Sequence, residues 1–174
     1  IVTRESFLVA GYGIHTNLEA GFTKDVAAYW DTYSGDNLEE KMYRQLMPPK
    51  HGEVGICIPC QREGEKAIYL FGVIVEDFRR VIPAMMTVEV PKGEYAVFLS
   101  PLVNNVDTAH TYDKDPLATA VKETWRYIFT QWFPNSPYEL DEEKYDFEFY
   151  DERCHALETA VMEIYVPIKK KAGG

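Results

Sequence analysis

The stretch KYDFEFYDE, residues 144–152, has the alternation of a β-strand and carries four acidic residues. Successive side chains of a strand point to opposite faces of the sheet, so Phe147 and Phe149 share one face. The other face carries Asp146, Glu148 and Tyr150. A carboxylate set between two phenylalanines either lies in water or needs a partner that is positively charged or donates hydrogen bonds.

The elements around this strand follow a definite order in the second half of the chain. Residues 86–100 predict two strands separated by a Pro-Lys-Gly turn. Residues 116–133 predict a helix that ends at Pro134, because apolar residues recur there at three- and four-residue spacing. Residues 144–152 and 160–168 then predict strand, loop and strand.

The first half shows the same order with different residues. Residues 6–16 predict a strand interrupted by glycines, and we expect Gly11-Tyr12-Gly13 to mark a β-bulge. Residues 25–33 and 37–46 predict two helices separated by a Ser-Gly-Asp break. Residues 52–60 and 67–77 predict a hairpin with a charged turn.

The chain therefore predicts an α+β fold in which a β-α-β-β repeat occurs in tandem, as a single domain over residues 1–174. The halves are expected at about 1–83 and 84–174, related by pseudo-twofold symmetry. Each half would contain an antiparallel sheet and one main helix. A central cleft between the halves is the expected ligand site.

Composition excludes several classes of protein. The 174 residues are 46% hydrophobic, which allows a packed core, and 14% aromatic, which leaves rings for a binding site. The formal net charge of −10 argues against direct contact with nucleic acid, because binding to phosphates needs Lys and Arg. We expect no membrane span and no signal peptide, and three cysteines suit the reducing cytoplasm.

Four stretches in register carry a resemblance to a known family. They are VPKGEYAVF (90–98), QWFPNSPYEL (131–140), YDFEFYDE (145–152) and MEIYVPIKK (162–170). This series resembles the GyrI-like effector-binding domain family, the ligand-sensing part of several bacterial transcription activators. The match is dense over residues 86–170 and thinner over the first half.

The resemblance implies the tandem fold with its cleft, and it implies a ligand. In multidrug-sensing members, an acidic residue on the matching strand faces the cleft and meets lipophilic cations; Glu148 stands at that position here. In regulators the domain follows a DNA-binding segment; because residue 1 leads directly into the first predicted strand, we expect no such segment in this chain. It is therefore similar to the stand-alone cation-binding proteins of integron cassettes. A separate DNA-binding protein partner and a homodimer both remain open.

These considerations give a set of candidate ligand-binding residues. Glu148 is the expected charge partner on the strength of the resemblance, although its spacing alone favours a strand face exposed to water. The expected ring-bearing walls of the site are Trp132, Tyr165, Trp125, Tyr43, Phe71 and Phe147, each of which also fits an ordinary core position. We expect Tyr165 to lie on the same side of the sheet as Glu148.

The expected activity is that of a sensor or sequestering module without chemistry. Two alternatives remain open. Some GyrI-like members resemble hydrolases of electrophilic natural products, in which case Glu148 would be a general base. Other relatives bind and inhibit a topoisomerase, which would make the chain a protein-interaction module.

Other motifs carry weaker signals. Cys57 and Cys60 have the spacing of redox pairs and zinc sites, but no second pair accompanies them, so buried thiols are the preferred interpretation. No catalytic triad and no phosphate-binding loop is recognisable. We therefore expect no cofactor and no metal.

Overall fold

The computed structural model of the chain describes residues 1–17, 21–59, 66–104 and 115–172. Within them the chain forms two compact units, which are described separately. One unit is Phe7–Val90, and the other combines Ile1–Ser6 with Pro91–Gly174. None of the helices in the described ranges is long and apolar enough to cross a membrane.

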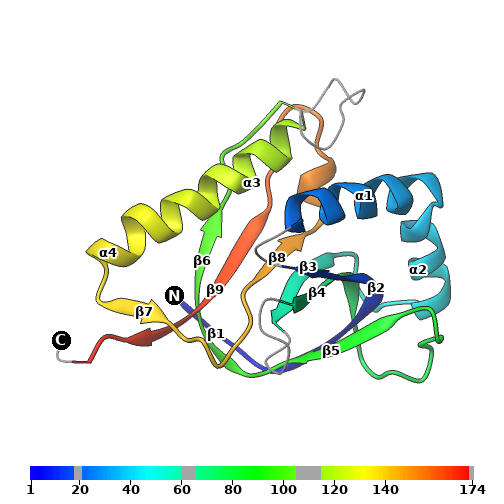
Figure 1. Cartoon of the computed structure of the whole chain (residues 1–174), viewed down its shortest axis with the longest axis horizontal. Helices are drawn as coiled ribbons and strands as arrows, with labels where there is room; N and C mark the ends of the chain where they lie inside the picture. Colours follow the sequence, from blue (N-terminus) through cyan, green and yellow to red (C-terminus); the bar gives the residue numbers. More distant parts are fainter. Residues whose placement is uncertain (18–20, 60–65, 105–114, 173–174) are drawn as a thin grey trace. The chain divides into compact units, whose positions relative to one another are not determined.

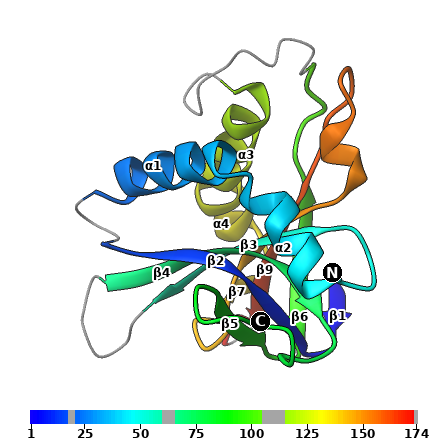
Figure 2. The same cartoon turned by 90° about the vertical axis from the view of Figure 1, so that its right-hand side faces the viewer.

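The unit Phe7–Val90 contains a four-stranded antiparallel sheet with the strand order β3-β4-β2-β5. Two helices pack against this sheet (Figure 2). The elements are β2 (Phe7–Asn17), α1 (Phe22–Gly35), α2 (Leu38–Leu46), β3 (Glu53–Pro59), β4 (Lys66–Val75) and β5 (Met86–Val90).

A local break separates the two helices of this unit. Asn37 adopts a left-handed conformation with φ 51°, which a short polar side chain tolerates, and α2 starts at the next residue. Met42 and Leu46 from α2 then pack on Ala10 and Val73 of the sheet. The helix break therefore turns the apolar stripe of α2 onto the strands.

The second unit is built around β9 and one long helical segment (Figure 1). Its sheet has the strand order β1-β6-β9-β8, and β7 also pairs with β9. The strands are β1 (Val2–Arg4), β6 (Gly93–Leu99), β7 (Tyr138–Leu140), β8 (Phe147–Tyr150) and β9 (Glu163–Lys170). The helical segments are α3 (Pro116–Tyr127), the π-helical η2 (Ile128–Trp132), α4 (Phe133–Asn135) and the 3-10 segment η3 (Glu152–His155).

Helix α3 has a hydrogen-bonded N-cap and buries one stripe of apolar side chains. The Asp115 carboxylate accepts hydrogen bonds from the backbone N–H groups of Leu117 and Ala118, and Pro116 occupies the first helical position. Leu117 and Val121 then pack on Ile164 of β9 in the core of this unit. Burying such aliphatic side chains contributes roughly 1.5–3 kcal/mol each.

The predicted fold class is confirmed: each unit is α+β, with antiparallel strands and the β-α-β-β order. Two short strands, β1 and β7, were not predicted, because three-residue strands leave no periodicity to detect. The two strands of residues 86–100 do not pair with each other. Instead, β5 pairs with β2, whereas β6 pairs with β1 and β9. Pairing partners depend on contacts that are distant in sequence.

The expected bulge at Gly11-Tyr12-Gly13 is wrong. Strand β2 pairs with β4 in unbroken register, and Gly11 lies directly opposite Gly72. A Cβ atom on Gly11 would lie 2.3 Å from the Cα of Gly72. The glycine is therefore required by the close approach of two backbones.

This close approach predicts a large effect of one methyl group. We expect Gly11→Ala to destabilise the chain by about 1–3 kcal/mol, because backbone atoms must move to admit the Cβ. The matched control is Gly35→Ala at the end of α1, where an added Cβ meets nothing within 4 Å. It should change stability by less than about 0.5 kcal/mol. Urea unfolding at constant m-value measures the stability change of both variants. Equal unfolding midpoints for Gly11→Ala and Gly35→Ala would contradict a close backbone approach at Gly11.

Candidate functional site

Glu148 lies in the middle of β8, and the strand register determines its surroundings. It is paired with Ile164 of β9, so the two side chains share one face of the sheet. Ile164 belongs to the core cluster that includes Leu117 and Val121 of α3. The carboxylate therefore points to the side of the sheet that α3 covers.

Both oxygens of this carboxylate accept hydrogen bonds. The indole Nε1–H of Trp125 donates to Oε1 at 2.7 Å, and the hydroxyl of Tyr150 donates to Oε2 at 2.5 Å. Glu148 is half-buried. Two donors thus hold the charged group in place beneath the helix, and it does not extend into bulk water.

The local sequence explains how these donors reach one carboxylate. Trp125 follows Leu117 and Val121 at four-residue spacing, so it continues the helix stripe that faces the sheet. Tyr150 is two residues beyond Glu148 on the same strand and shares its face. Both rings also pack against the core cluster of this unit.

The electrostatics of the site favour a neutral acid or a positively charged neighbour. Burial raises the pKa of Glu148 above its ordinary value, and the hydrogen bonds from Tyr150 and Trp125 offset part of this shift. Asp146 directly precedes β8, two residues before Glu148. Burial, together with the negative charge of Glu148, raises its pKa to about 6. Two partly desolvated carboxylates therefore lie close together, and a cation would stabilise both.

An aromatic surface adjoins this pair. The ring of Trp125 stacks on that of Phe129, with the centroids 6.1 Å apart and an interplanar angle of 14°. Phe129 is 47% exposed, which is high for a phenylalanine. Phe129 is absent from the predicted ring-bearing walls, and its four-residue spacing from Trp125 in the helix of residues 116–133 is the signal that could have identified it.

The expectation that Tyr165 shares a face with Glu148 is wrong. Tyr165 pairs with Phe147, so both rings lie on the opposite face of the sheet, where they stack with centroids 4.7 Å apart. Both are buried. The guanidinium of Arg4 lies 5.1 Å from the centre of the Tyr165 ring, a cation–π contact. A one-residue change of register reverses every side chain of a strand, and the sequence did not specify the register.

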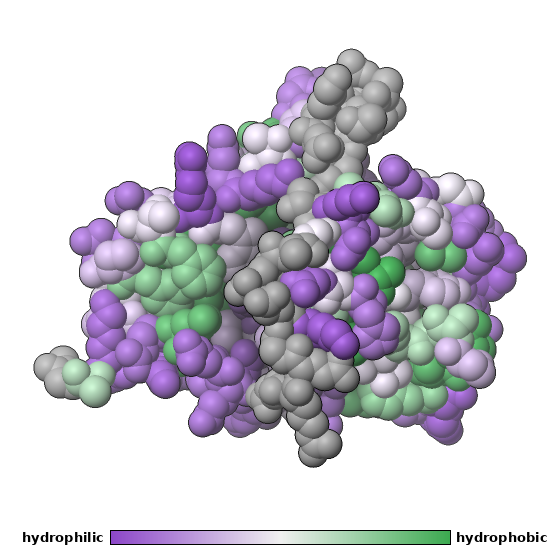
Figure 3. Space-filling model, in the orientation of Figure 1, coloured by the Kyte–Doolittle hydropathy of each residue, from purple (hydrophilic) through white to green (hydrophobic). Residues whose placement is uncertain are grey.

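Trp132 lies in another ring cluster, at the end of the helical segment. Its ring is edge-on to Phe98 at 5.0 Å and stacks on Tyr138 of β7 at 6.2 Å. A hydrophobic patch is visible on the surface beside α4 and β7 (Figure 3). Trp132 is therefore positioned by contacts with β6 and β7, and its predicted role in ligand binding stays a prediction.

The remaining predicted rings belong to the unit Phe7–Val90. Phe71 makes edge-to-face contacts with Trp30 at 4.7 Å and Tyr33 at 5.5 Å. Tyr43 stacks on His51 at 5.5 Å. The structure brings Trp125 and Tyr150 to Glu148, and it places Phe71 and Tyr43 in a different unit. Their predicted part in a shared cleft with Glu148 stays a prediction.

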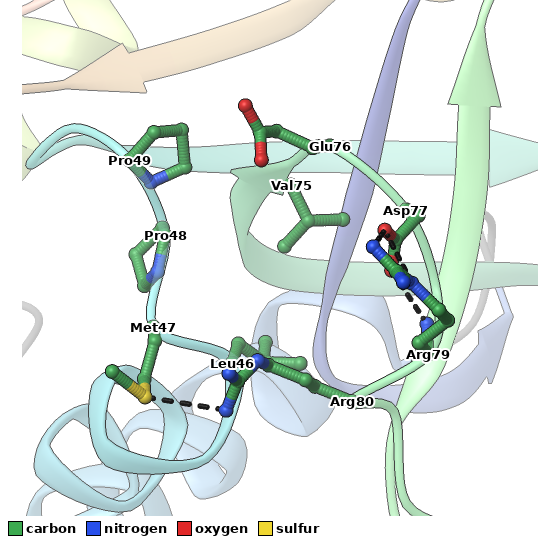
Figure 4. A pocket seen from close by; sticks show the side chains of 9 residues that line it. All are labelled: Leu46, Met47, Pro48, Pro49, Val75, Glu76, Asp77, Arg79 and Arg80. Atoms are coloured by element: carbon green, nitrogen blue, oxygen red, sulfur yellow. Dashed lines mark hydrogen bonds and ion pairs between the residues drawn. The ribbon is translucent and has the colours of Figure 1, made fainter.

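One cavity of about 510 Å³ lies in the unit Phe7–Val90 (Figure 4). Its walls combine apolar and charged side chains, and none of the predicted ligand-binding residues lines it. Arg79 is paired with Asp77, and Arg80 donates to the Sδ atom of Met47 at 3.2 Å. The lining residues are Leu46, Met47, Pro48, Pro49, Val75, Glu76, Asp77, Arg79 and Arg80.

A second cavity of about 370 Å³ lies between β6 and α3. Thr124, the neighbour of Trp125, lines it together with Phe98 and Tyr127. This cavity is more apolar than the first, and it lies next to the helix that supplies the indole donor to Glu148. It offers apolar surface near the candidate site.

Only one cysteine of the Cys57/Cys60 pair lies within the described residues. Cys57 is half-buried in β3 rather than fully buried, and Cys60 lies outside the described residues. Cys154 is also half-buried and packs against the core of its unit.

Comparisons with known proteins agree with this fold. A family model described as "Cass2: Integron-associated effector binding protein" matches residues 1–168. No curated protein sequence matches the chain. The structure of SAV2435 bound to tetraphenylphosphonium is similar with a TM-score of 0.73 and 16% identity, over 97% of this chain and 92% of that one.

Two other solved structures show the same fold. A putative bacterial transcription regulation protein from Staphylococcus aureus MU50 has a TM-score of 0.67 and 17% identity, over 97% of this chain and 95% of that chain. The integron cassette protein VCH_CASS2 from Vibrio cholerae has a TM-score of 0.54 and 16% identity, over 97% and 94%. The GyrI-like resemblance is thereby confirmed. Because the family model spans nearly the whole sequence, the chain belongs to the Cass2 family of integron-associated effector binding proteins.

Proposed function

We propose that this protein binds lipophilic cationic or aromatic small molecules, with Glu148 as the charge partner, and acts as a sensor or sequestering module. The observation that carries the proposal is a half-buried carboxylate held by two aromatic donors beside an exposed ring stack. Membership of an effector-binding family supports it. SAV2435, which is similar in fold, was solved with tetraphenylphosphonium, a lipophilic cation.

The physical chemistry of the site suits such a ligand. An incoming cation replaces water near Glu148 and Asp146 and compensates charges that burial has made costly. A contact between the cation and an aromatic face contributes roughly 0.5–2 kcal/mol. Burial of apolar ligand surface adds about 25 cal/mol per Å² before ordering costs are subtracted. Micromolar affinity, about −8 kcal/mol, needs no further hydrogen bonds.

The two donors have a defined part in this proposal. Trp125 and Tyr150 stabilise the charged form of Glu148, so the carboxylate remains able to attract a cation despite its burial. They also restrict its rotamer. A preorganised charge loses less entropy on binding than a mobile one. Broad selectivity follows, because rings and a charge discriminate weakly among planar cations.

A hydrolase remains the second candidate, because a raised pKa also suits a general base working near neutral pH. The two candidates differ in one observable. A binding protein returns its ligand unchanged, whereas a hydrolase consumes an electrophilic substrate in a reaction that depends on Glu148. Inhibition of a topoisomerase, a DNA-binding protein partner and a homodimer stay predictions.

The charge of Glu148 is tested by one isosteric change. Glu148→Gln should weaken binding of tetraphenylphosphonium about 30-fold, or roughly 2 kcal/mol, because the ligand loses its counter-charge. Binding of tetraphenylborate, an anion of the same shape, should not weaken. The matched control is Glu142→Gln, an exposed acid of the same unit, which should leave both affinities unchanged. Calorimetry on the three proteins measures this, and equal phosphonium affinities would disprove the assignment.

The role of the indole donor is tested separately. Trp125→Phe keeps a ring but removes the N–H group, so the pKa of Glu148 should rise further. Affinity for tetraphenylphosphonium should fall roughly 5-fold near neutral pH, which corresponds to about 1 kcal/mol for one hydrogen bond. The fall should shrink at higher pH, where Glu148 is charged in both proteins. A loss of affinity that does not vary with pH would instead indicate that only packing was damaged.

The protonation of the two acids gives a pH profile. Glu148 and Asp146 both have raised pKa values, so each is charged above its pKa and neutral below it. Tyr150, which donates to Glu148, and Cys154, which packs against the same core cluster, are further titratable groups, while Trp125 and Ile164 contribute no charge. Phosphonium affinity should therefore fall as pH is lowered from about 7.5 to about 5, with loss of the Asp146 charge near its pKa of about 6. A flat profile over this range would contradict the proposal.

A further inference from the structure

A group of metal-ligating side chains lies in the unit Phe7–Val90 and includes none of the residues of the proposed function. Glu39 comes from α2, Glu53 begins β3, and His51 lies in the connection between them. One ligand atom from each lies within 4.8 Å of the others. The Nε2 atom of His51 is 3.9 Å from Oε1 of Glu53.

One oxygen of the buried member of this group has no hydrogen-bond partner among the described residues. Glu53 is 3% exposed, and its Oε2 atom accepts no hydrogen bond from any described residue. Leaving a buried carboxylate oxygen unpaired costs of the order of 1–3 kcal/mol or more. A second carboxyl group, that of Glu39, lies beside it. A bound cation would compensate both carboxylates.

We propose that Glu39, His51 and Glu53 bind a divalent first-row transition-metal ion. One imidazole nitrogen and carboxylate oxygens are donors that Zn²⁺ accepts, at bond lengths of about 2.0–2.2 Å. Such bonds require donor atoms roughly 3–3.5 Å apart, so the side chains must approach each other by only about one ångström. The exposed His51 and the half-buried Glu39 have the freedom to do so.

Neighbouring groups hold the imidazole in position and leave an entry path. The ring of His51 stacks on Tyr43, with an interplanar angle of 14°. The Tyr43 hydroxyl accepts a hydrogen bond at 3.0 Å from the backbone N–H of Gly52, the residue between the two ligands. Such surrounding contacts orient metal ligands. His51 is 41% exposed, so an ion reaches the group from solvent.

The electrostatics of Glu53 agree with this geometry. Burial, together with the adjacent Glu39 carboxyl, raises the pKa of Glu53 to about 8. The inference is independent of the proposed function, because it uses neither Glu148 nor any residue of its unit.

Zn²⁺ titration of chelator-stripped protein tests the proposal. The wild-type chain should bind one equivalent with micromolar affinity and melt at a higher temperature with the ion present. Glu53→Gln and His51→Ala should each weaken binding at least about 10-fold. His51 is exposed, so His51→Ala retains the fold even if the buried Glu53→Gln does not. Absence of Zn²⁺ binding, or binding unaffected by His51→Ala, would overturn the proposal.

Matched controls separate this site from other donors. Glu40→Gln changes the exposed residue next to Glu39, and His15→Ala removes an exposed histidine of β2; neither should alter Zn²⁺ affinity. Co²⁺ should bind without a thiolate charge-transfer band, and such a band would assign the ion to the cysteines and disprove the proposal. His51→Ala should leave tetraphenylphosphonium binding unchanged, so the metal site and the proposed function fail independently.

Discussion

Between α3 and β8, one carboxylate joins a helix to a strand. Glu148 accepts hydrogen bonds from the indole of Trp125 and the hydroxyl of Tyr150. Its position constrains the rest of the unit: Val121 and Trp125 must lie on the helix stripe that faces the sheet, and β8 must pair with β9 in the register that opposes Glu148 to Ile164. A shift of the β8–β9 register by one residue would place Phe147 opposite Ile164 and turn the carboxylate of Glu148 to the other face of the sheet. The polar contact therefore acts with the hydrophobic core in specifying the packing of α3 on the sheet.

The same contact decides what the site can do. A buried carboxylate without donors would take up a proton and lose its charge, whereas a fully hydrated one would attract every cation weakly. Two aromatic donors produce an intermediate state, in which the acid stays ionisable close to apolar ring surface. The unit Phe7–Val90 shows a different solution to a similar problem. There Glu53 is more deeply buried, one of its oxygens has no partner, and an imidazole and a second carboxyl group lie beside it.

Much of the secondary structure could be predicted, because it depends on local patterns. The Ser-Gly-Asp break at residues 34–36 indicated two helices, and the structure has α1 ending at Gly35 and α2 starting at Leu38. The hairpin of β3 and β4 was recognisable from two apolar runs and a charged turn. Where predictions failed, distant partners were responsible. The sequence predicts Gly11 as a bulge residue, but a glycine is needed there because the backbone of Gly72, 61 residues later in the chain, approaches closely. The prediction that Tyr165 lies on the same side of the sheet as Glu148 failed because the register of a strand is determined by its partner strand.

The sequence by itself determined the order of the elements, the family to which the chain belongs and the candidate acid at position 148, because alternation, helical spacing and motif order are properties of neighbouring residues. Only the tertiary structure decided which groups meet that acid. Trp125 and Tyr150 reach it, while Tyr165 and Phe147 stack on the opposite face and Trp132 packs against β7. The physical reason is that a side chain's neighbours depend on strand register and helix packing, which are settled by contacts among residues far apart in the chain.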